Sequence, residues 1–198
     1  MTAILKVDTI QDTSGNNIIN ESSNTITIGA SGDTTNIVGT LQNNGSAVAV
    51  NNSPSFFALL SSSQTGLSDA ATVKLAANTE VYDNGGVYDN SSNYRFTPGV
   101  AGKYFIYAGA LVSSGAESNL REAEMYVYKN GSSISKASFN HVANYSQSST
   151  LTASFVNIAD DNDYYEVYVA VNTQSGNWLI AGDSGSARSY FGAYKIIE

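Results

Sequence analysis

The chain has 198 residues, which is long enough for one well-buried domain and an accessory segment. Its 17 Asp and Glu residues outnumber its 9 Lys and Arg residues, and the resulting formal charge of -8 repels phosphate backbones, so we expect no nucleic-acid partner. The absence of cysteine excludes disulfides, thiolate metal sites and cysteine nucleophiles.

The N-terminal residues lack the apolar core of a secretory signal, because Met1 to Asp8 hold only a few apolar side chains. No apolar run in the chain approaches the roughly 18 residues that a membrane-spanning helix needs. We therefore expect neither export by that route nor membrane insertion.

Residues 1–53 have the composition of a β-rich fibrous stalk. They contain no aromatic residue, and short apolar pieces alternate with Gly, Asn, Ser and Asp turns. Two similar phrases, Thr25–Gly29 and Thr35–Gly39, indicate a repeated strand–turn unit of a fibre whose chains wind together. A disordered polar leader is the alternative interpretation. The apolar pieces of this region are Ile4–Val7, Ile18–Ile19, Ile26–Ile28 and Ile37–Val38.

A linker at Asn51-Asn52-Ser53-Pro54 divides this stalk from a domain that spans residues 54–198. All Phe, Tyr and Trp residues lie in that domain, which alternates strand-like runs with turn signals and shows no helical periodicity. Eleven runs indicate an all-β sandwich or barrel. They are residues 56–60, 72–75, 80–82, 93–96, 102–112, 122–129, 132–139, 150–158, 164–171, 177–180 and 188–197.

Two turns and one strand carry more specific information. Asn130-Gly131 predicts a two-residue hairpin, because Asn and Gly accept positive φ angles, and Asp160–Asp163 predicts a solvated turn. The run Gly102–Val112 is apolar on both alternating faces after Lys103, so both of its faces need cover. A neighbouring subunit around a symmetry axis is the simplest cover for the second face.

Five segments of the predicted domain follow one another in an order typical of a known family of globular heads. They are Val81–Asn84, Tyr94–Ile106, Lys129–Gly131, Leu151–Val171 and Tyr190–Tyr194. Through these segments, residues 54–198 resemble the globular heads of complement component C-one-q and tumour necrosis factor. The resemblance implies an antiparallel jelly-roll sandwich of ten strands that forms a homotrimer, recognises proteins or glycans and catalyses no reaction. Together with the two-sided strand, it places Tyr104, Ile106, Tyr107, Tyr190 and Tyr194 at the trimer interface.

The stalk region resembles the openings of bacteriophage tail-fibre proteins, which share its Leu-x-Val-Asp-x-Ile and Asn-x-Ile-x-Ile-Gly phrases. This resemblance implies a virion protein that is assembled in the host cytoplasm beside other tail or baseplate proteins. We expect the head to bind a host-surface glycan or protein, with Tyr145 and Trp178 as contact residues, because Tyr and Trp combine an apolar face with a polar tip. A decoration or connector protein without receptor binding is the alternative.

An enzyme is a weaker interpretation, and a glycan depolymerase is its most specific form. His141 is the only histidine, and an exposed loop position explains it better than a catalytic triad does. The carboxylates of Asp160, Asp161 and Asp163, or of Glu122 and Glu124, fit a solvated turn and a solvated strand face better than a glycosidase pair. The acidic turn also suits calcium, although it lacks the spacing of a dedicated site, so we expect no cofactor or metal.

Overall fold

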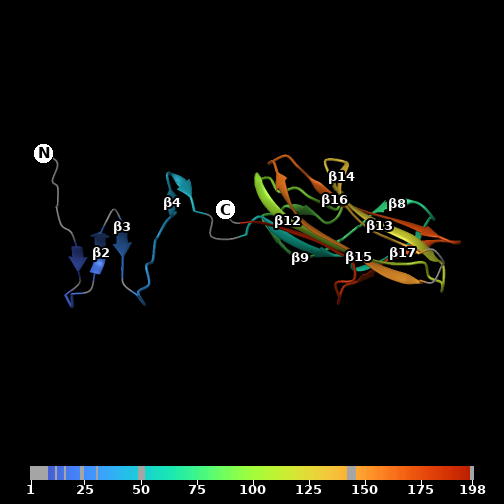
Figure 1. Cartoon of the computed structure of the whole chain (residues 1–198), viewed down its shortest axis with the longest axis horizontal. Helices are drawn as coiled ribbons and strands as arrows, with labels where there is room; N and C mark the ends of the chain where they lie inside the picture. Colours follow the sequence, from blue (N-terminus) through green and yellow to red (C-terminus); the bar gives the residue numbers. More distant parts are fainter. Residues whose placement is uncertain are drawn as a thin grey trace. The chain divides into compact units, whose positions relative to one another are not determined.

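The computed structural model describes residues 9–11, 13–15, 17–22, 25–29, 31–48, 52–141 and 146–196. The chain forms two compact units, Met1–Val48 and Ala49–Glu198, which we call the N-terminal unit and the head (Figure 1). The boundary that the sequence predicts, between residues 53 and 54, lies between this division and the first strand of the head at Ser55.

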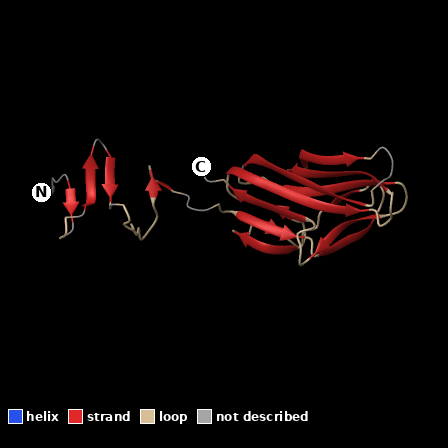
Figure 2. Cartoon of the chain, turned by 60° about the horizontal axis from the view of Figure 1, so that its bottom comes forward, coloured by secondary structure: helices blue, strands red, loops and turns tan. Residues whose placement is uncertain are grey.

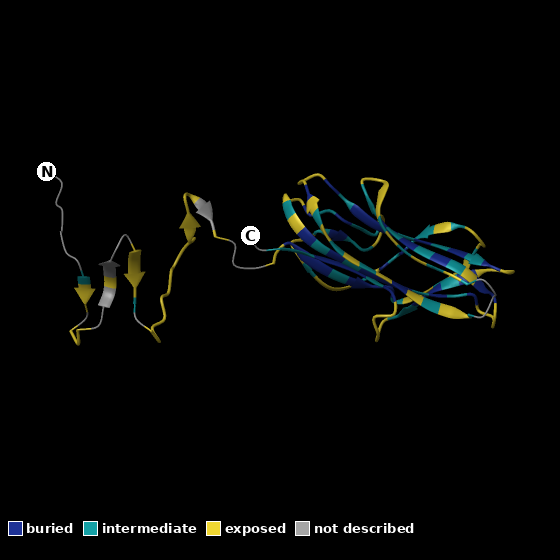
Figure 3. Ribbon diagram, in the orientation of Figure 1, coloured by how far each residue is buried: buried dark blue, intermediate teal, exposed yellow. Residues whose placement is uncertain are grey.

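The N-terminal unit is a small antiparallel meander. Its strands β1 (Thr9–Gln11), β2 (Asn17–Ser22) and β3 (Thr25–Ile28) pair in sequence order, and a separate hairpin joins β4 (Gln42–Asn43) to β5 (Ser46–Ala47). None of its residues with a described side chain is buried, so the unit has no core of its own (Figure 3).

Two of the four predicted apolar pieces in this unit lie in strands, at β2 and β3. The third, Ile37–Val38, was predicted as a strand and is not one, because no neighbouring segment pairs with it and the backbone turns at Gly39, whose φ is 135°. The fourth, Ile4–Val7, lies outside the described residues.

The head is built of strands alone, and the part of the chain that the structure describes holds no helix and thus no helix able to cross a membrane (Figure 2). Its strands are β6 (Ser55–Leu59), β7 (Ser62–Leu67), β8 (Thr72–Lys74), β9 (Thr79–Asn84), β10 (Tyr88–Asp89), β11 (Arg95–Phe96), β12 (Gly102–Ser113), β13 (Leu120–Lys129), β14 (Ser132–Asn140), β15 (Ser148–Ala159), β16 (Tyr165–Thr173), β17 (Trp178–Asp183) and β18 (Tyr190–Lys195).

These strands form two antiparallel sheets that lie face to face. The β12 sheet has the order β7-β17-β12-β18-β6-β9, and β15 pairs with the other edge of β12 along its full length. The β16 sheet has the order β10-β11-β16-β13-β14, and β8 also pairs with β16. The predicted all-β sandwich is confirmed. The head has more strands than the predicted ten, and some are short; only Leu60 and Ser61, for example, separate β6 from β7.

The core lies between the two sheets and is rich in aromatic rings. Phe56 stacks on Tyr88 with ring centroids 4.4 Å apart and meets the edge of Phe191 at 5.0 Å. The polar tips of buried rings have hydrogen-bond partners, as when the Tyr104 hydroxyl donates to the Val100 carbonyl at 2.8 Å and the Tyr165 hydroxyl to the Asn157 side chain at 2.8 Å. Burial therefore leaves no unpaired side-chain donor or acceptor among the described residues.

The predicted hairpin turn at Asn130-Gly131 is confirmed. It joins β13 to β14, and the φ angles of Asn130 and Gly131 are 50° and 78°, the positive values that a two-residue turn of this kind requires. Residues alternate along β16, with Val167 and Val169 pointing into the core and Tyr168 pointing outward.

Candidate functional site

One outer face of the sandwich, on the β12 sheet, is lined by apolar and aromatic side chains. Alternate residues of β12 point to opposite sides, so Phe105 and Tyr107 point outward, and the strands beside β12 add further rings to the same face. We call this set the aromatic face. It comprises Phe57, Tyr82, Phe105, Tyr107, Val156, Ile158, Tyr190 and Tyr194.

The rings of the aromatic face form a layer that crosses several strands. Phe105 lies opposite Val156 on β15 and Tyr194 on β18, and the Phe105 and Tyr194 ring centroids are 5.4 Å apart. Across the next position, Phe57 and Tyr107 stack with centroids 5.9 Å apart. Directly opposite residues of an antiparallel sheet contact each other, so strand pairing itself gathers these rings.

Two glycines make room for the rings. Gly192 lies between Tyr107 and Phe57 in the pairing of β12, β18 and β6, and a Cβ atom on Gly192 would overlap the Tyr107 ring. In the same way, a Cβ atom on Gly109 would overlap the ring of Tyr190. Each ring therefore lies over a glycine of the adjacent strand, close to the backbone of the sheet.

None of the eight side chains of the aromatic face is charged near neutral pH. The pKa of Tyr107 is raised, first by burial and then by its hydrogen bond with Tyr82. Val156 and Ile158 remain 53% and 65% exposed at the β15 side of the face. Lys103, the pairing partner of Ile158, falls on the same side of β12 and adds one charged residue beside these eight. A partly exposed patch of apolar and aromatic side chains with little charge is typical of a surface that contacts another protein.

The predicted trimer-interface residues divide between the two sides of the β12 sheet. Tyr107, Tyr190 and Tyr194 lie on the aromatic face, where their contact with another subunit stays a prediction. Tyr104 and Ile106 were placed wrongly, because the strand alternation turns them into the core, where neither is exposed. The sequence analysis missed the other five members of the face, although strict alternation along β12 would have placed Phe105 on the same side as Tyr107. The missed residues are Phe57, Tyr82, Phe105, Val156 and Ile158.

The other outer face, on the β16 sheet, is polar and carries three tyrosines beside ion pairs. We call it the polar face. The Tyr128 and Tyr168 ring centroids are 4.7 Å apart, and the Lys74 ammonium lies 5.4 Å from the centre of the Tyr168 ring. Its residues are Lys74, Glu124, Tyr126, Tyr128, Lys136, Glu166 and Tyr168.

Charge pairs hold the side chains of the polar face in place. Lys74 Nζ lies 2.6 Å from Glu166 Oε1; partial burial alone would lower the pKa of Lys74, but the hydrogen bond and charge of Glu166 raise it overall. On the neighbouring strands, Glu124 pairs with Lys136, which lowers the pKa of Glu124. The face thus presents fixed charges and ring surfaces together.

A polar cavity of about 400 Å³ opens beside the polar face. On its floor, Glu122 of β13 lies between Asn140 and Asn172 of the adjacent strands, and the Asn172 amide donates to Glu122 at 2.8 Å. His141 also lines it, so this residue, predicted as an exposed loop residue, is half-buried at the rim of a cavity. The full lining is Asp69, Arg121, Glu122, Asn140, His141, Asn172 and Thr173.

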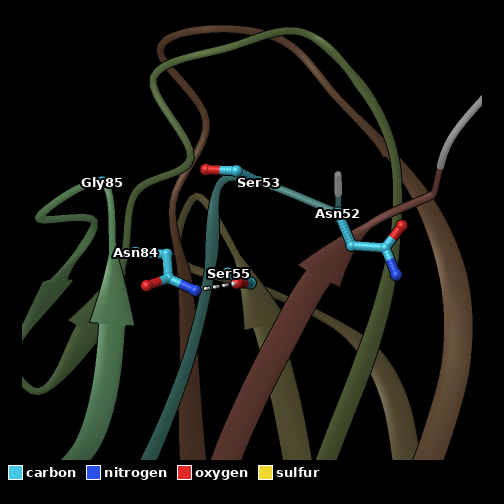
Figure 4. A pocket seen from close by; sticks show the side chains of 5 residues that line it. All are labelled: Asn52, Ser53, Ser55, Asn84 and Gly85. Atoms are coloured by element: carbon cyan, nitrogen blue, oxygen red, sulfur yellow. Dashed lines mark hydrogen bonds between the residues drawn. The ribbon is translucent and has the colours of Figure 1, made fainter. Parts of the chain in front are cut away.

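A second polar cavity, of about 540 Å³, lies at the start of β6. Figure 4 shows the Asn84 amide directed at the Ser55 hydroxyl, and the two atoms are 3.3 Å apart. Asn52, Ser53 and Gly85 complete the lining. These side chains bear no charge, and the cavity lines up no group suited to acid–base chemistry.

Of the two predicted receptor contacts, the structure describes only Trp178. Trp178 is 1% exposed, and its indole N–H donates to the Ser68 carbonyl at 2.7 Å, so the prediction of a surface contact is wrong. The physical reason is that β17 turns this residue into the core. Tyr145 lies outside the described residues.

The acidic turn differs from its prediction at one position. Asp160 and Asp161 are exposed, as expected, but Asp163 is buried and pairs with Lys129 at 2.7 Å. Across the described ranges, no three His, Asp or Glu side chains converge as metal ligands. The oxygens of Asp163 are instead engaged by Lys129, Asn130 and the Asp160 amide.

Comparison with known proteins places the fold. No protein-family model and no curated protein matches the sequence. Among solved structures, murine APRIL at pH 5.0 aligns with a TM-score of 0.52 and 10% identity, over 72% of this chain and 98% of that chain. Eiger TNF from S. frugiperda aligns with a TM-score of 0.51 and 7% identity, over 72% of this chain and 91% of that chain. The head is a jelly roll of the tumour-necrosis-factor type.

This jelly-roll head agrees with the predicted fold class. The globular domain of the zebrafish complement 1qA protein also aligns, with a TM-score of 0.49 and 13% identity, over 72% of this chain and 97% of that chain. In the sandwich itself, the central strand β12 is apolar on both sides because one side of it faces the core and the other forms the aromatic face.

Proposed function

We propose that this protein is a non-catalytic recognition protein, a virion tail fibre or appendage tip, whose head self-associates through the aromatic face and binds a host-surface ligand through the polar face. The observation that carries this proposal is the chemical difference between the two outer faces of one sandwich. The aromatic face, with little charge, suits a permanent contact with another copy, and the face with fixed charges and rings suits a polar ligand.

Of the two proposed roles of the head, self-association has the stronger support. A monomer would leave Val156, Ile158 and the neighbouring rings in water, and a second copy would remove this apolar area from solvent. A closed ring of three heads is the assembly that the sequence resemblance implies. In such a ring, one surface of each copy contacts a different surface of the next copy.

The polar face and its cavity are the proposed ligand site. Tyrosine rings, carboxylates and amides in one region provide both stacking surfaces and hydrogen-bond partners, which is the chemistry that recognises a glycan or a polar protein surface. The virion setting is supported by the tail-fibre-like phrases of residues 1–53 and by the N-terminal meander.

The test of self-association is the mass of the full chain measured by light scattering and sedimentation. We expect a trimer for the unmodified chain, and Ile158→Glu should weaken association at least tenfold, because burying the new carboxylate in the contact costs more than its pairing with Lys103 on the adjacent strand returns. Ile134→Glu is the matched control, since Ile134 is an exposed isoleucine on the other sheet and its replacement should leave the mass unchanged. A monomeric unmodified chain at micromolar concentration would refute the proposal.

Ligand recognition needs a separate measurement, the binding of labelled protein to intact host cells. We expect the double variant Tyr128→Ser/Tyr168→Ser to lose binding while it keeps the trimer mass. If the unmodified trimer binds no cells, the connector function replaces receptor binding, because a connector has no need of the cell surface.

A further inference from the structure

The N-terminal unit carries isoleucines at a fixed interval of nine residues, at Ile10, Ile19, Ile28 and Ile37. The strand pairing gives the interval a structural meaning. Ile10 is the pairing partner of Ile19, and Ile19 is the pairing partner of Ile28. Directly opposite residues share a face of a sheet, so the first three isoleucines form one straight row across β1, β2 and β3.

This row is not covered within the chain's described residues. Ile10, Ile19 and Ile28 are 40%, 38% and 57% exposed, and Ile26, two residues before Ile28 and so on the same face, is exposed as well. The neighbouring positions Thr9 and Thr27 belong to the opposite face of the sheet, and Glu21, the pairing partner of Ile26, ends the apolar stretch on the face of the row. A single sheet that exposes an apolar row needs a second layer to cover it.

The chemistry of the segment identifies what covers the row. Residues 9–48 contain Asp12, Glu21 and Asp33 as their only charged side chains, so they offer no charge pattern for a partner of opposite charge. The row presents the same side chain at one spacing. A surface that matches such spacing along its length is the same row of another copy, as when identical side chains of separate chains interdigitate between paired sheets.

We propose that Ile10, Ile19 and Ile28 form a self-association seam, in which the rows of several copies of this chain pack against one another and Ile37 continues the spacing. The seam gives the N-terminal unit the core that one copy lacks. It is a second contact between copies, separate from the aromatic face of the head, and it stands without the proposed ligand or virion setting.

The absence of cysteine from the chain allows a direct test with the full-length protein. A single cysteine at Ile19→Cys or Ile28→Cys would place thiols of two copies in the seam, and mild oxidation should join them in covalent dimers. Thr27→Cys is the matched control, since Thr27 is exposed on the other face of the same strand. We expect the seam cysteines to give dimers in at least fivefold higher yield than the control.

The result that would overturn the seam is equal yield at positions 19 and 27, or no dimer at position 19 in a chain whose mass shows association. Failure of the head contact is distinguished by combining Ile19→Cys with Ile158→Glu. Dimers that persist in this combination support the seam even if the head does not associate, and their loss would refute the seam as an independent contact.

A second measurement covers variants that alter folding. Ile19→Thr/Ile28→Thr keeps β-branched side chains but removes the apolar row, and it should lower the strand signal of the N-terminal unit in far-ultraviolet circular dichroism. Val38→Thr replaces an apolar residue that is 94% exposed and outside the nine-residue spacing, so it should leave the signal unchanged. An equal effect of both changes would contradict the seam.

Discussion

At the scale of single residues, Asp163 shows how one buried carboxylate joins two turns. Its side chain accepts hydrogen bonds from the Asn130 amide at 2.6 Å and from the Asp160 backbone N–H at 2.7 Å, and it pairs with Lys129. Asn130 in turn accepts from the Tyr164 backbone N–H at 2.9 Å. The β13–β14 hairpin and the β15–β16 turn are therefore fixed to each other through one charged group.

We expect Asp163→Asn to lower the free energy of unfolding of the head by about 2 kcal/mol, because Lys129 would lose the partner of a largely buried pair. Asp161→Asn is the control, since Asp161 is exposed in the same turn and its replacement should change the stability by less than about 0.5 kcal/mol. Urea unfolding of both variants, followed by fluorescence, measures the difference. Equal stability of the two variants would show that the bridge contributes nothing.

The carboxylate of Asp163 also predicts how the stability of the head depends on pH in acid. Burial acts to raise the pKa of Asp163, but the hydrogen bonds from Lys129, the Asp160 amide and Asn130 outweigh it and hold the pKa below the ordinary value of 3.8. A group with a lowered folded pKa contributes stability that is complete above the unfolded pKa and is lost as the pH falls through the folded one. Below pH 3.8, the stability of Asp163→Asn should therefore fall less steeply than that of the unmodified chain.

At the scale of strands, the sequence predicted long elements well and short ones poorly. The alternating runs of β12, β13, β15 and β16 were recognised because each buries one regular face. Strand β7 was missed because Ser62–Leu67 holds one apolar side chain, and its position depends on pairing with β17, which lies far away in sequence. Which face of β12 meets the core was beyond local pattern, since both faces are apolar. Alternation alone, however, separates Tyr104 and Ile106 from Tyr107, so placing all three at one interface was a misreading of the two-residue period.

The glycines beneath the aromatic rings supply a prediction at this scale. Gly192→Ala should displace the Tyr107 ring and lower the unfolding free energy by about 1–3 kcal/mol, because the new Cβ overlaps the ring. In a Tyr107→Ser background the same change should cost much less, and this coupling separates ring overlap from a general backbone effect. Gly185→Ala, in an open turn, is the control, and thermal melts of the four variants decide the question. Additive effects at positions 107 and 192 would contradict the proposed contact.

At the scale of the whole molecule, two units of opposite construction share one chain. The head closes a core between two sheets, whereas none of the described apolar side chains of the N-terminal unit is buried (Figure 3). All aromatic residues follow residue 55, so Trp178 and the tyrosines report on the head alone. Circular dichroism in the far ultraviolet reports the strands of both units.

This asymmetry makes the stability of each unit separately measurable. We expect heating to give two transitions in far-ultraviolet circular dichroism, of which only one coincides with the red shift of the buried Trp178 emission. Both should move to higher temperature as protein concentration rises, because association stabilises the folded state. Ile158→Glu should lower the transition that Trp178 detects, and Ile19→Thr/Ile28→Thr should lower only the other, because the two contacts lie in separate units. A single transition that both variants lower equally would show instead that the two units unfold as one cooperative body, and the two contacts would then have to be treated as a single interface.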